Sequence, residues 1–399
     1  MTGIKQAVIL AGGRGKRLRP ITDKIPKPMV QINGRPFLEY LVELLNENGI
    51  SEIVMLLGYL PDKVIEHLGD GSKFGIKIKY SVGAVEDETG TRIRNAKHLL
   101  DNKFLLLYCD NYWPLKLGSI LDFYRRFGKL AMLTAYNNRD GGGEYGYKNN
   151  LTILENGEVT FYGQPAKSVE LNAIDIGFFV LDKKILNFMP AHNFSFQHEG
   201  LPRLIAERQL AAYRTDHPYY PITGEKLLNA AAHFLEPKKV IFLDRDGVIN
   251  KKMPEENYVK HWEEFEFLPG ALEALSLLKK AGYQTYIITN QRGVGRGLMK
   301  ESDLETLHSK LAKELKENNI EFGGIYYCPH DFVADCFCRK PKPGMFFRAA
   351  REHHLDLTKA WFVGDDQRDL EAGKAAGCKT ILLDQNRNLL RIVQEEILI

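Results

Sequence analysis

The chain has 399 residues, 44% of them hydrophobic and 26% charged, with a formal net charge of +3. This length predicts two or three domains, and the composition excludes a largely disordered chain. The nearly balanced charge argues against a nucleic-acid-binding or membrane-binding protein. The apolar run at residues 7–11 is too short for a signal sequence or a membrane span, so we expect a cytoplasmic protein whose thiols stay reduced. The sequence leaves a homo-oligomer open.

Short apolar runs alternate with amphipathic segments in both halves of the chain, which is typical of α/β folds with mostly parallel sheets. A polar stretch containing Pro237 precedes the second half, and it predicts domains at residues 1–236 and 237–399. The expected strands are residues 5–10, 53–57, 104–108, 239–243, 285–289, 361–363 and 379–383, and the expected helices are residues 37–48, 120–127, 271–280 and 302–318.

The first strand ends in a loop rich in glycine and cations, with the sequence Leu10-Ala-Gly-Gly-Arg-Gly-Lys-Arg. It is not a Walker loop, because no Gly-Lys-Ser/Thr follows, and it lacks the third glycine of the dinucleotide fingerprint. Glycines let backbone N–H groups approach a polyphosphate, and an arginine can lie across it. The residues expected to bind phosphates here are Leu10, Ala11, Gly12, Gly13, Gly15 and Arg17.

Two further segments follow this loop, Ile25-Pro-Lys-Pro-Met and Gly34-Arg-Pro-Phe-Leu-Glu-Tyr. Together the three resemble the sugar-1-phosphate nucleotidyltransferases over about residues 4–235, and the first hundred residues look similar to heptose-1-phosphate guanylyltransferases. The resemblance implies a Rossmann-like fold in which a sugar 1-phosphate attacks the α-phosphate of a nucleoside triphosphate. Positioning and charge neutralisation then supply the catalysis.

The resemblance also implies roles for single residues of this half. Lys27 joins Arg17 as a cationic contact, and Asp110 is the magnesium-binding aspartate. The remaining correspondences are Gly90 and Thr91, beside the sugar, and Asp175, in the place of a sugar-binding asparagine.

Two positions depart from the family pattern. Gly163-Gln164-Pro165 stands where Glu-Lys-Pro is usual, and Thr223 stands where a second magnesium aspartate is expected. The loss of a cation and a carboxylate weakens transition-state stabilisation. Arg92 or Arg94 could supply positive charge instead; both lie in a segment that looks like that of the cytidylyltransferases. An active transferase and a domain that only binds sugar phosphate or nucleotide both stay open.

The second half opens with a buried strand that delivers Asp244 and Asp246 to its carboxyl end, where open α/β sheets place their sites. An Asp-x-Asp-Gly fragment also occurs in calcium loops and ordinary turns, but the later calcium ligands are missing here. Groups suited to phosphate and Mg²⁺ follow in order, namely Thr289, Asn290 and Gln291, then Arg339 and Lys340, then Asp365 and Asp366.

This order resembles the haloacid-dehalogenase-like phosphatases over about residues 238–385, which have a Rossmannoid fold. The resemblance implies that Asp244 is the nucleophile and that Asp246 protonates the leaving oxygen and later activates water. Asp244, the Asp246 carbonyl and Asp365 would hold Mg²⁺. Lys340 would offset the remaining charge, and Thr289 would hold a phosphate oxygen.

Residues 328–338 contain three of the five cysteines and a histidine. Four such ligands in one loop, Cys328, His330, Cys336 and Cys338, are enough for a closed tetrahedral Zn²⁺ site. A reduced compartment argues against a disulfide, and a redox pair is more often Cys-x-x-Cys. We expect a structural zinc that stiffens the loop before Arg339 and Lys340. The other two cysteines, Cys109 and Cys378, are expected to be small buried hydrophobic side chains.

The arrangement Cys-x-His…Cys-x-Cys-Arg-Lys-Pro resembles the D-glycero-D-manno-heptose 1,7-bisphosphate 7-phosphatases and the histidinol-phosphate phosphatases. Residues 258–270 and 290–298 favour the heptose branch and make Arg296 a candidate ligand for the sugar or its second phosphate. Asp366 stands where heptose enzymes often carry lysine.

The two resemblances together imply a bifunctional enzyme for surface-glycan precursors. It would remove the 7-phosphate of the heptose bisphosphate and then activate the heptose 1-phosphate with a nucleoside triphosphate. A phosphatase with a binding-only first domain, or a histidinol-phosphate phosphatase, is the alternative.

Overall fold

The computed structural model describes residues 3–139, 148–164, 169–254, 257–384 and 387–399. The chain divides into two compact units, Met1–Leu235 and Glu236–Ile399. Within the described ranges, no helix has both the length and the apolar character needed to cross a membrane.

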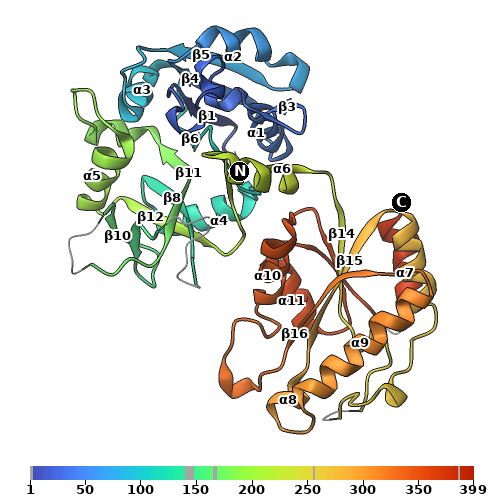
Figure 1. The fold of residues 1–399 in the computed structure, drawn as a ribbon. Helices are drawn as coiled ribbons and strands as arrows, with labels where there is room; N and C mark the ends of the chain where they lie inside the picture. The colour runs from blue at the N-terminus through green and yellow to red at the C-terminus, as the bar shows by residue number, and fades with distance from the viewer. Residues whose placement is uncertain (1–2, 140–147, 165–168, 255–256, 385–386) are drawn as a thin grey trace. The chain divides into compact units, whose positions relative to one another are not determined.

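The first unit is built on a seven-stranded sheet with the order β12-β8-β11-β6-β1-β4-β5 (Figure 1). All neighbouring strands pair in parallel except β11, which runs antiparallel to β6 and β8. The amino end of β11 therefore lies at the same edge as the carboxyl ends of β1 and β6. The bounds are β1 (Gln6–Ala11), β4 (Glu52–Leu57), β5 (Lys77–Val82), β6 (Lys103–Tyr108), β8 (Ala131–Tyr136), β11 (Ile174–Asp182) and β12 (Leu210–Thr215).

Helices cover both faces of this sheet, which explains why β1 is apolar at successive positions instead of alternating with polar residues. Ala7 and Ile9 belong to one core cluster, and Val8 and Leu10 belong to the other. The first cluster includes side chains of α1 (Phe37–Glu47), α2 (Pro61–Leu68), α4 (Leu117–Phe127) and α6 (Glu225–Leu235), and the second includes those of α3 (Thr89–Asn95) and α5 (Leu201–Ala206). The short strands are β2 (Gln31–Ile32), β3 (Arg35–Pro36), β7 (Asn111–Tyr112), β9 (Leu151–Ile153), β10 (Val159–Tyr162) and β13 (Tyr220–Pro221).

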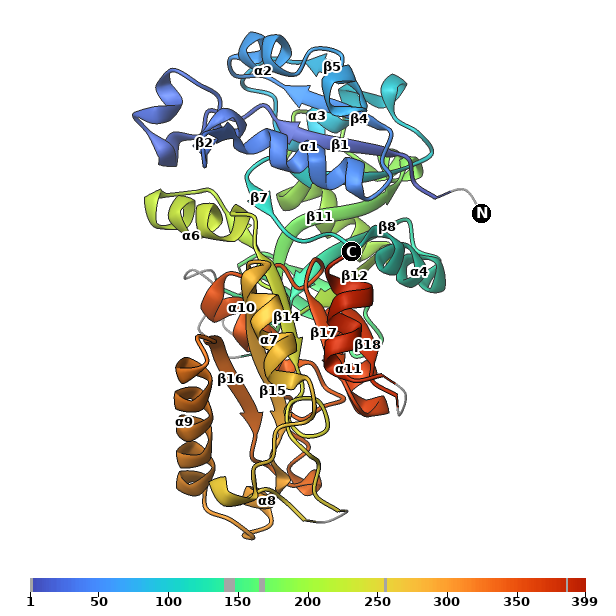
Figure 2. The same cartoon turned by 90° about the vertical axis from the view of Figure 1, so that its right-hand side faces the viewer.

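The second unit has a five-stranded, fully parallel sheet with the order β16-β15-β14-β17-β18 (Figure 2). Its strands are β14 (Lys239–Leu243), β15 (Tyr283–Asn290), β16 (Phe322–Cys328), β17 (Trp361–Gly364) and β18 (Lys379–Leu382). One core cluster includes α7 (Ala271–Lys280), α9 (Glu301–Glu317) and α12 (Leu389–Ile392), and the other includes α10 (Gly344–His353) and α11 (Gln367–Ala376). The short helix α8 (Arg292–Gly295) follows β15.

Each strand and helix named from the sequence has a counterpart in the structure, and β14 and α7 have the expected bounds. The expectation for the two isolated cysteines is confirmed, because Cys109 and Cys378 are 8% and 7% exposed within the core clusters. The antiparallel strand β11 was not predicted.

Candidate active sites

A cavity of about 580 Å³ lies at the carboxyl ends of β1 and β6 in the first unit. The loop after β1 forms one wall, and side chains distant in the sequence form the rest. Of the residues expected to bind phosphates and metal, the lining includes Leu10, Gly12, Gly13, Gly15, Arg17, Lys27 and Asp110.

Lys27 and Asp110 form an ion pair beside this cavity, with 2.5 Å between Nζ and Oδ2. Asp110 follows β6, and Lys27 begins a short 3₁₀ turn flanked by prolines. The segment that contains Thr223 lies next to Asp110, since the Ile222 N–H donates to the Asp110 carbonyl over 2.9 Å. The structure therefore brings together the two positions that the resemblance connected with magnesium.

Arg92 lines the 580 Å³ cavity, but the guanidiniums of Arg92 and Arg94 are engaged by backbone carbonyls. The Arg92 guanidinium is buried and donates to the carbonyls of Leu57 and Ala84, each over 2.7 Å. A Cβ added to Gly12 would lie 2.3 Å from Arg92 Cζ, so glycine lets this arginine reach under the phosphate loop. Arg94 donates to the His192 carbonyl over 2.8 Å. The guanidinium N–H groups of both side chains need acceptors inside the fold, and backbone carbonyls provide them.

Gly90 and Thr91 pack against the segment that contains Phe194. A Cβ on Gly90 would come within 2.1 Å of the Phe194 ring, and the Thr91 hydroxyl accepts from the Phe194 N–H over 3.0 Å. These contacts hold the segment around Phe194 in place, and neither Gly90 nor Thr91 lines the 580 Å³ cavity.

Asp175 lies near the amino end of β11 and also outside the lining of that cavity. Its carboxylate accepts from the Tyr162 hydroxyl over 3.0 Å and from the Gly177 N–H over 2.8 Å. Burial raises the pKa of Asp175 to about 6, although these donors oppose the rise. Gln164 is exposed in the bend after β10, and Pro165 lies outside the described residues.

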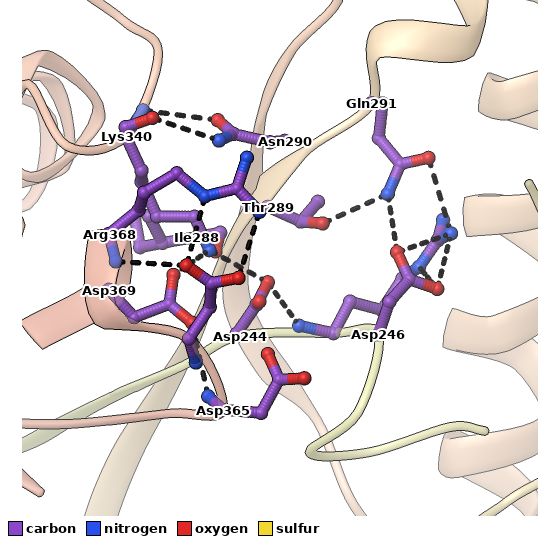
Figure 3. A network of polar contacts seen from close by, with 12 residues as sticks. Asp244, Asp246, Ile288, Thr289, Asn290, Gln291, Lys340, Asp365, Arg368 and Asp369 are labelled. Atoms are coloured by element: carbon purple, nitrogen blue, oxygen red, sulfur yellow. Dashed lines mark hydrogen bonds and ion pairs between the residues drawn. The ribbon is translucent and has the colours of Figure 1, made fainter. Parts of the chain in front are cut away.

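The second unit places Asp244 directly after the central strand β14, facing Lys340 (Figure 3). Lys340 Nζ lies 2.9 Å from Asp244 Oδ1 and 2.7 Å from Asp369 Oδ1, and its side chain is 2% exposed. Burial lowers the pKa of Lys340, but the two carboxylates outweigh burial and raise it above its usual value. Burial raises the pKa of Asp244 to about 7, while Lys340 opposes the rise. The lysine is therefore a fixed charge inside the site.

Asp369 is a functional residue that the sequence reasoning missed. It lies one helical turn after Asp365 in α11, and its carboxylate accepts from the N–H groups of Asp365 and Asp366, each over 3.1 Å. Carboxylate oxygens of Asp244, Asp365 and Asp369 all lie within 4.8 Å of one another. The spacing Gly364-Asp-Asp-x-x-Asp carries the signal, because a residue at the third helical position faces back to the helix start.

Asp246 is held by three side chains that donate to its carboxylate. The donors are Arg245 over 2.9 Å, Asn250 over 2.9 Å and Gln291 over 2.8 Å. Burial raises the pKa of Asp246, but the Arg245 charge and these hydrogen bonds hold it below its usual value. Arg245 is fully buried, and its Nη1 lies 3.1 Å from His308 Nε2. Burial lowers the pKa of His308 to about 3, so the imidazole is neutral and accepts from Arg245.

The amides expected to bind phosphate have protein partners instead. The Asn290 side chain exchanges two 3.1 Å hydrogen bonds with the backbone of Lys340. Gln291 donates to Asp246 and, over 2.9 Å, to the Thr289 hydroxyl. Buried amides need hydrogen-bond partners, so these contacts orient Lys340 and Asp246. Phosphate binding by Asn290 and Gln291 stays a prediction.

The carboxylates fit a hard divalent cation such as Mg²⁺, which prefers oxygen ligands. Asp365 Oδ1 is buried and has no hydrogen-bond partner among the described residues, while Oδ2 accepts from Lys252 over 2.7 Å. The backbone at Gly247, with φ of 92°, passes so close that an added Cβ would lie 2.3 Å from Asp365 Oδ2. The glycine of the Asp-x-Asp-Gly segment therefore lets the two strand ends approach.

A second cavity, of about 320 Å³, opens beside Asp246 and Asn290. Its cationic lining residues are Lys252, Arg292, Arg339 and Arg368. Arg296, the candidate predicted from the sequence, is not in the lining, and Arg292, one helical turn earlier, takes that place.

The side chains of Cys328, His330, Cys336 and Cys338 meet in one cluster, with all ligand atoms within 4.8 Å. The sulfur of Cys328 lies 3.5 Å from that of Cys336, and the sulfur of Cys338 lies 3.2 Å from His330 Nδ1. A tetrahedral zinc with Zn–S distances of about 2.3 Å separates its sulfur ligands by roughly 3.7 Å, so the cluster fits this metal. The hydrogen bond with Cys338 lowers the pKa of the Cys328 thiol to about 5, which favours the thiolate that metals bind.

Comparison with known proteins assigns both units to families. Residues 6–220 match the nucleotidyl transferase family model, and residues 337–390 match that of the HAD-hydrolase-like proteins. The D-glycero-beta-D-manno-heptose-1,7-bisphosphate 7-phosphatase of Pseudomonas putida is 42% identical over 145 residues, which cover 36% of this chain and 82% of that protein. The enzyme of the same name from Escherichia coli O6:H1 is 40% identical over 150 residues, covering 36% and 77%.

The chain belongs to the nucleotidyl transferases and to the phosphatase family of these relatives. It is thus an enzyme that combines a nucleotidyltransferase with a phosphomonoester hydrolase. A solved structure, the inositol-1-phosphate CTP transferase of T. maritima, shares the fold with a TM-score of 0.50 at 19% identity and covers 58% of this chain and 94% of that one.

Proposed function

We propose that residues 237–399 remove the 7-phosphate of D-glycero-D-manno-heptose 1,7-bisphosphate and that residues 1–236 couple the resulting heptose 1-phosphate to a nucleoside triphosphate. The observation that carries the first step is the buried Asp244–Lys340–Asp369 arrangement. It is supported by 42% identity over 145 residues to a D-glycero-beta-D-manno-heptose-1,7-bisphosphate 7-phosphatase. The second step follows from the transferase family of the first unit, since the product of one reaction is a sugar 1-phosphate.

In the phosphatase reaction the Asp244 carboxylate attacks phosphorus and forms an aspartyl-phosphate, while the P–O bond to the sugar breaks. The negative charge of the bound substrate phosphate would raise the pKa of Asp246 from its low value in the empty site, so that Asp246 can hold the proton it gives to the leaving sugar oxygen. Asp246 then accepts a proton from the water that hydrolyses the intermediate. Arg245, Asn250 and Gln291 hold Asp246 in place for both transfers. Lys340 offsets the negative charge beside Asp244.

Asp244, the Asp246 carbonyl and Asp365 would hold Mg²⁺, which when bound supplies positive charge between the carboxylate and the phosphate. The unsatisfied Asp365 Oδ1 supports this assignment. We further propose that the cluster in residues 328–338 holds a structural Zn²⁺, because four ligands leave no open position for chemistry.

In the transferase reaction a phosphate oxygen of the sugar 1-phosphate attacks the α-phosphate, and pyrophosphate leaves. The glycine loop and Arg17 line the cavity where the triphosphate would bind, and Lys27 would contact its charged oxygens. Asp110 would be a ligand of Mg²⁺ here, and Thr223 near it would contribute only a hydroxyl.

Phosphate release tests the proposed phosphatase substrate. The full chain with Mg²⁺ should release phosphate from heptose 1,7-bisphosphate far faster than from histidinol phosphate, and Asp244→Asn should abolish both. Faster turnover of histidinol phosphate would support the rival substrate and contradict this proposal.

A second candidate for the first unit is a module that binds sugar phosphate or nucleotide without catalysis. The observations in its favour are the neutral, exposed Gln164, the hydroxyl of Thr223, and the engagement of Arg92 and Arg94 with backbone carbonyls. Pyrophosphate release with any of the four common nucleoside triphosphates would exclude this candidate.

A further inference from the structure

Arg245 is a fully buried cation beside the proposed general acid of the phosphatase site. It lies between the two aspartates of the Asp-x-Asp-Gly segment, and its side chain bends toward the second of them. Nη2 lies 2.9 Å from Asp246 Oδ1 and 3.0 Å from Oδ2. Burying a charge costs free energy unless its N–H groups find partners, so the other contacts of this guanidinium decide how firmly it holds the carboxylate.

The remaining terminal nitrogen of this guanidinium, Nη1, meets His308 of α9. His308 is 7% exposed, and its Nε2 lies 3.1 Å from Nη1. An arginine can only donate, so the imidazole accepts here, which requires the neutral ring with its proton on Nδ1. Burial is the main cause that lowers the pKa of His308 to about 3, and it keeps the ring neutral beside the cation.

His308 is one of three side chains that fix the orientation of Arg245. Nη2 also donates to Gln291 Oε1 over 3.2 Å, and the Gln291 amide in turn donates to Asp246 Oδ2 over 2.8 Å (Figure 3). In the described part of the chain, His308 supplies the one acceptor within hydrogen-bonding distance of Nη1. Without that acceptor a buried N–H group is left unpaired, and the guanidinium gains a reason to rotate away from Asp246.

Packing alone does not require an imidazole at position 308. The other buried residues of α9 are all leucines, and they form the apolar face that this helix turns to the core. The His308 ring also packs near the Tyr327 ring, with 5.5 Å between their centroids, a contact that an apolar side chain could make as well. A buried polar side chain is costly without a hydrogen-bond partner, so the contact with Arg245 is the feature that only an acceptor can provide.

We propose that His308 is a positioning residue of the phosphatase reaction, which acts through Arg245 to keep the Asp246 carboxyl in the orientation that proton transfer requires. The inference rests on the proposed function, because it takes Asp246 as the group that protonates the leaving oxygen. In that step the O–H bond of Asp246 breaks, the proton moves to the leaving oxygen, and the P–O bond breaks with its electron pair on that oxygen. A carboxyl that turns away loses this transfer, while attack by Asp244 on phosphorus is not affected.

The test compares two substrates whose leaving groups differ in their need for a proton. The sugar oxygen of heptose 1,7-bisphosphate must be protonated as it leaves, whereas p-nitrophenolate leaves p-nitrophenyl phosphate as a stable anion. His308→Leu keeps a buried apolar side chain but removes the acceptor. We expect it to slow single-turnover release of heptose 1-phosphate about ten- to a hundredfold, and to leave single-turnover release of p-nitrophenolate at the wild-type rate.

His308→Gln is the conservative variant, because its amide oxygen can accept from Arg245 Nη1, and it should restore most of the rate with the bisphosphate. His308→Phe keeps a ring beside Tyr327 without an acceptor, and it replaces His308→Leu if the leucine variant does not fold. Ser309→Ala is the matched control, since Ser309 is the exposed neighbour on α9, and it should leave both rates unchanged.

Equal slowing of both substrates in His308→Leu would show a general structural role and overturn the inference, as would an unchanged rate with the bisphosphate. A glutamine variant as slow as the leucine variant would overturn it too, because the acceptor would then not matter. If wild type releases p-nitrophenolate but no heptose 1-phosphate, the proposed substrate is wrong. The same comparison with histidinol phosphate, whose leaving oxygen also needs a proton, then decides the role of His308 by itself.

Discussion

At the scale of single residues, Lys340 shows how the phosphatase site keeps a buried side chain positively charged. A lysine that is 2% exposed stays charged only because Asp244 and Asp369 both contact it. Asp244 becomes covalently occupied during the reaction, so Asp369 is the partner that holds Lys340 throughout. This makes Asp369 a positioning residue for the lysine.

We expect Asp369→Asn to lower kcat for phosphate release by about ten- to a hundredfold, because Lys340 loses its fixed counterion. Asp366→Asn is the matched control, since it starts the same helix and pairs with Arg368 instead of Lys340. Steady-state kinetics of both variants check this prediction. Equal losses in the two variants would mean that the start of α11, and not the Lys340 contact, accounts for the effect.

Asp175 gives a pH-dependent prediction for the first unit. Its pKa is about 6 in the folded protein, above the usual value of 3.8, so its ionisation opposes folding. The destabilisation is absent at low pH, where Asp175 is protonated in both the folded and the unfolded protein. It develops as the pH rises from about 4 to 6 and reaches its full size of about 3 kcal/mol above pH 6.

Asp175→Asn removes this penalty while keeping an acceptor for the Gly177 N–H. Calorimetry should therefore find the variant more stable than wild type at pH 8, with the difference shrinking toward zero near pH 4. A difference of the same size at both pH values would contradict the assignment of a raised pKa.

Several site residues could be predicted from the sequence because motif order fixes which strand ends meet. Asp244, Lys340 and Asp365 lie together for this reason. The direction of side chains was not predictable, so the contacts of Asn290 with Lys340 and of Gln291 with Asp246 were not foreseen. Arg292 and Arg296 lie about one helical turn apart, as do Asp365 and Asp369. The spacing of the sequence alone did not show which residues of these two pairs contribute to the site.

At the scale of elements, β11 shows what hydrophobic patterning leaves open. The strand is apolar and buried, but its direction depends on how the chain returns to the sheet, which composition does not specify. Gly177, with φ of 80°, lies where the register between β11 and β8 shifts, and an added Cβ would meet the Tyr108 ring at 2.9 Å. The parallel sheet of the second unit followed from patterning because short βα repeats allow only that pairing.

The zinc loop, residues 328–338, gives the prediction that belongs to this scale. Cys336→Ser should reduce zinc from one ion per chain to well below that, because a three-ligand site binds zinc more weakly than a four-ligand site. The loop leads into Arg339 and Lys340, so phosphatase activity and thermal stability should fall as well. Elemental analysis and thermal unfolding check both effects, with Val333→Ala, at an exposed position of the same loop, as the control. Full activity at zero zinc would exclude a structural role for the metal.

At the scale of the whole molecule, the two activities should separate cleanly by mutation, because their residues belong to different compact units. Lys27→Ala removes the partner of Asp110 and a cation of the 580 Å³ cavity, and it should abolish pyrophosphate release while phosphate release continues. Lys24→Ala, an exposed lysine near it in the sequence, should leave both unchanged. Loss of phosphate release in Lys27→Ala would show that the first unit is required for the phosphatase reaction.

The most direct test of the account supplies the full chain with heptose 1,7-bisphosphate, one nucleoside triphosphate at a time, and Mg²⁺, and follows phosphate, pyrophosphate and sugar nucleotide together. We expect phosphate to appear first, and pyrophosphate and a nucleotide-linked heptose to follow with one of the nucleotides. Asp244→Asn should stop all three products from the bisphosphate but should still convert added heptose 1-phosphate. Phosphate release without pyrophosphate under every nucleotide would contradict consecutive catalysis by the two units.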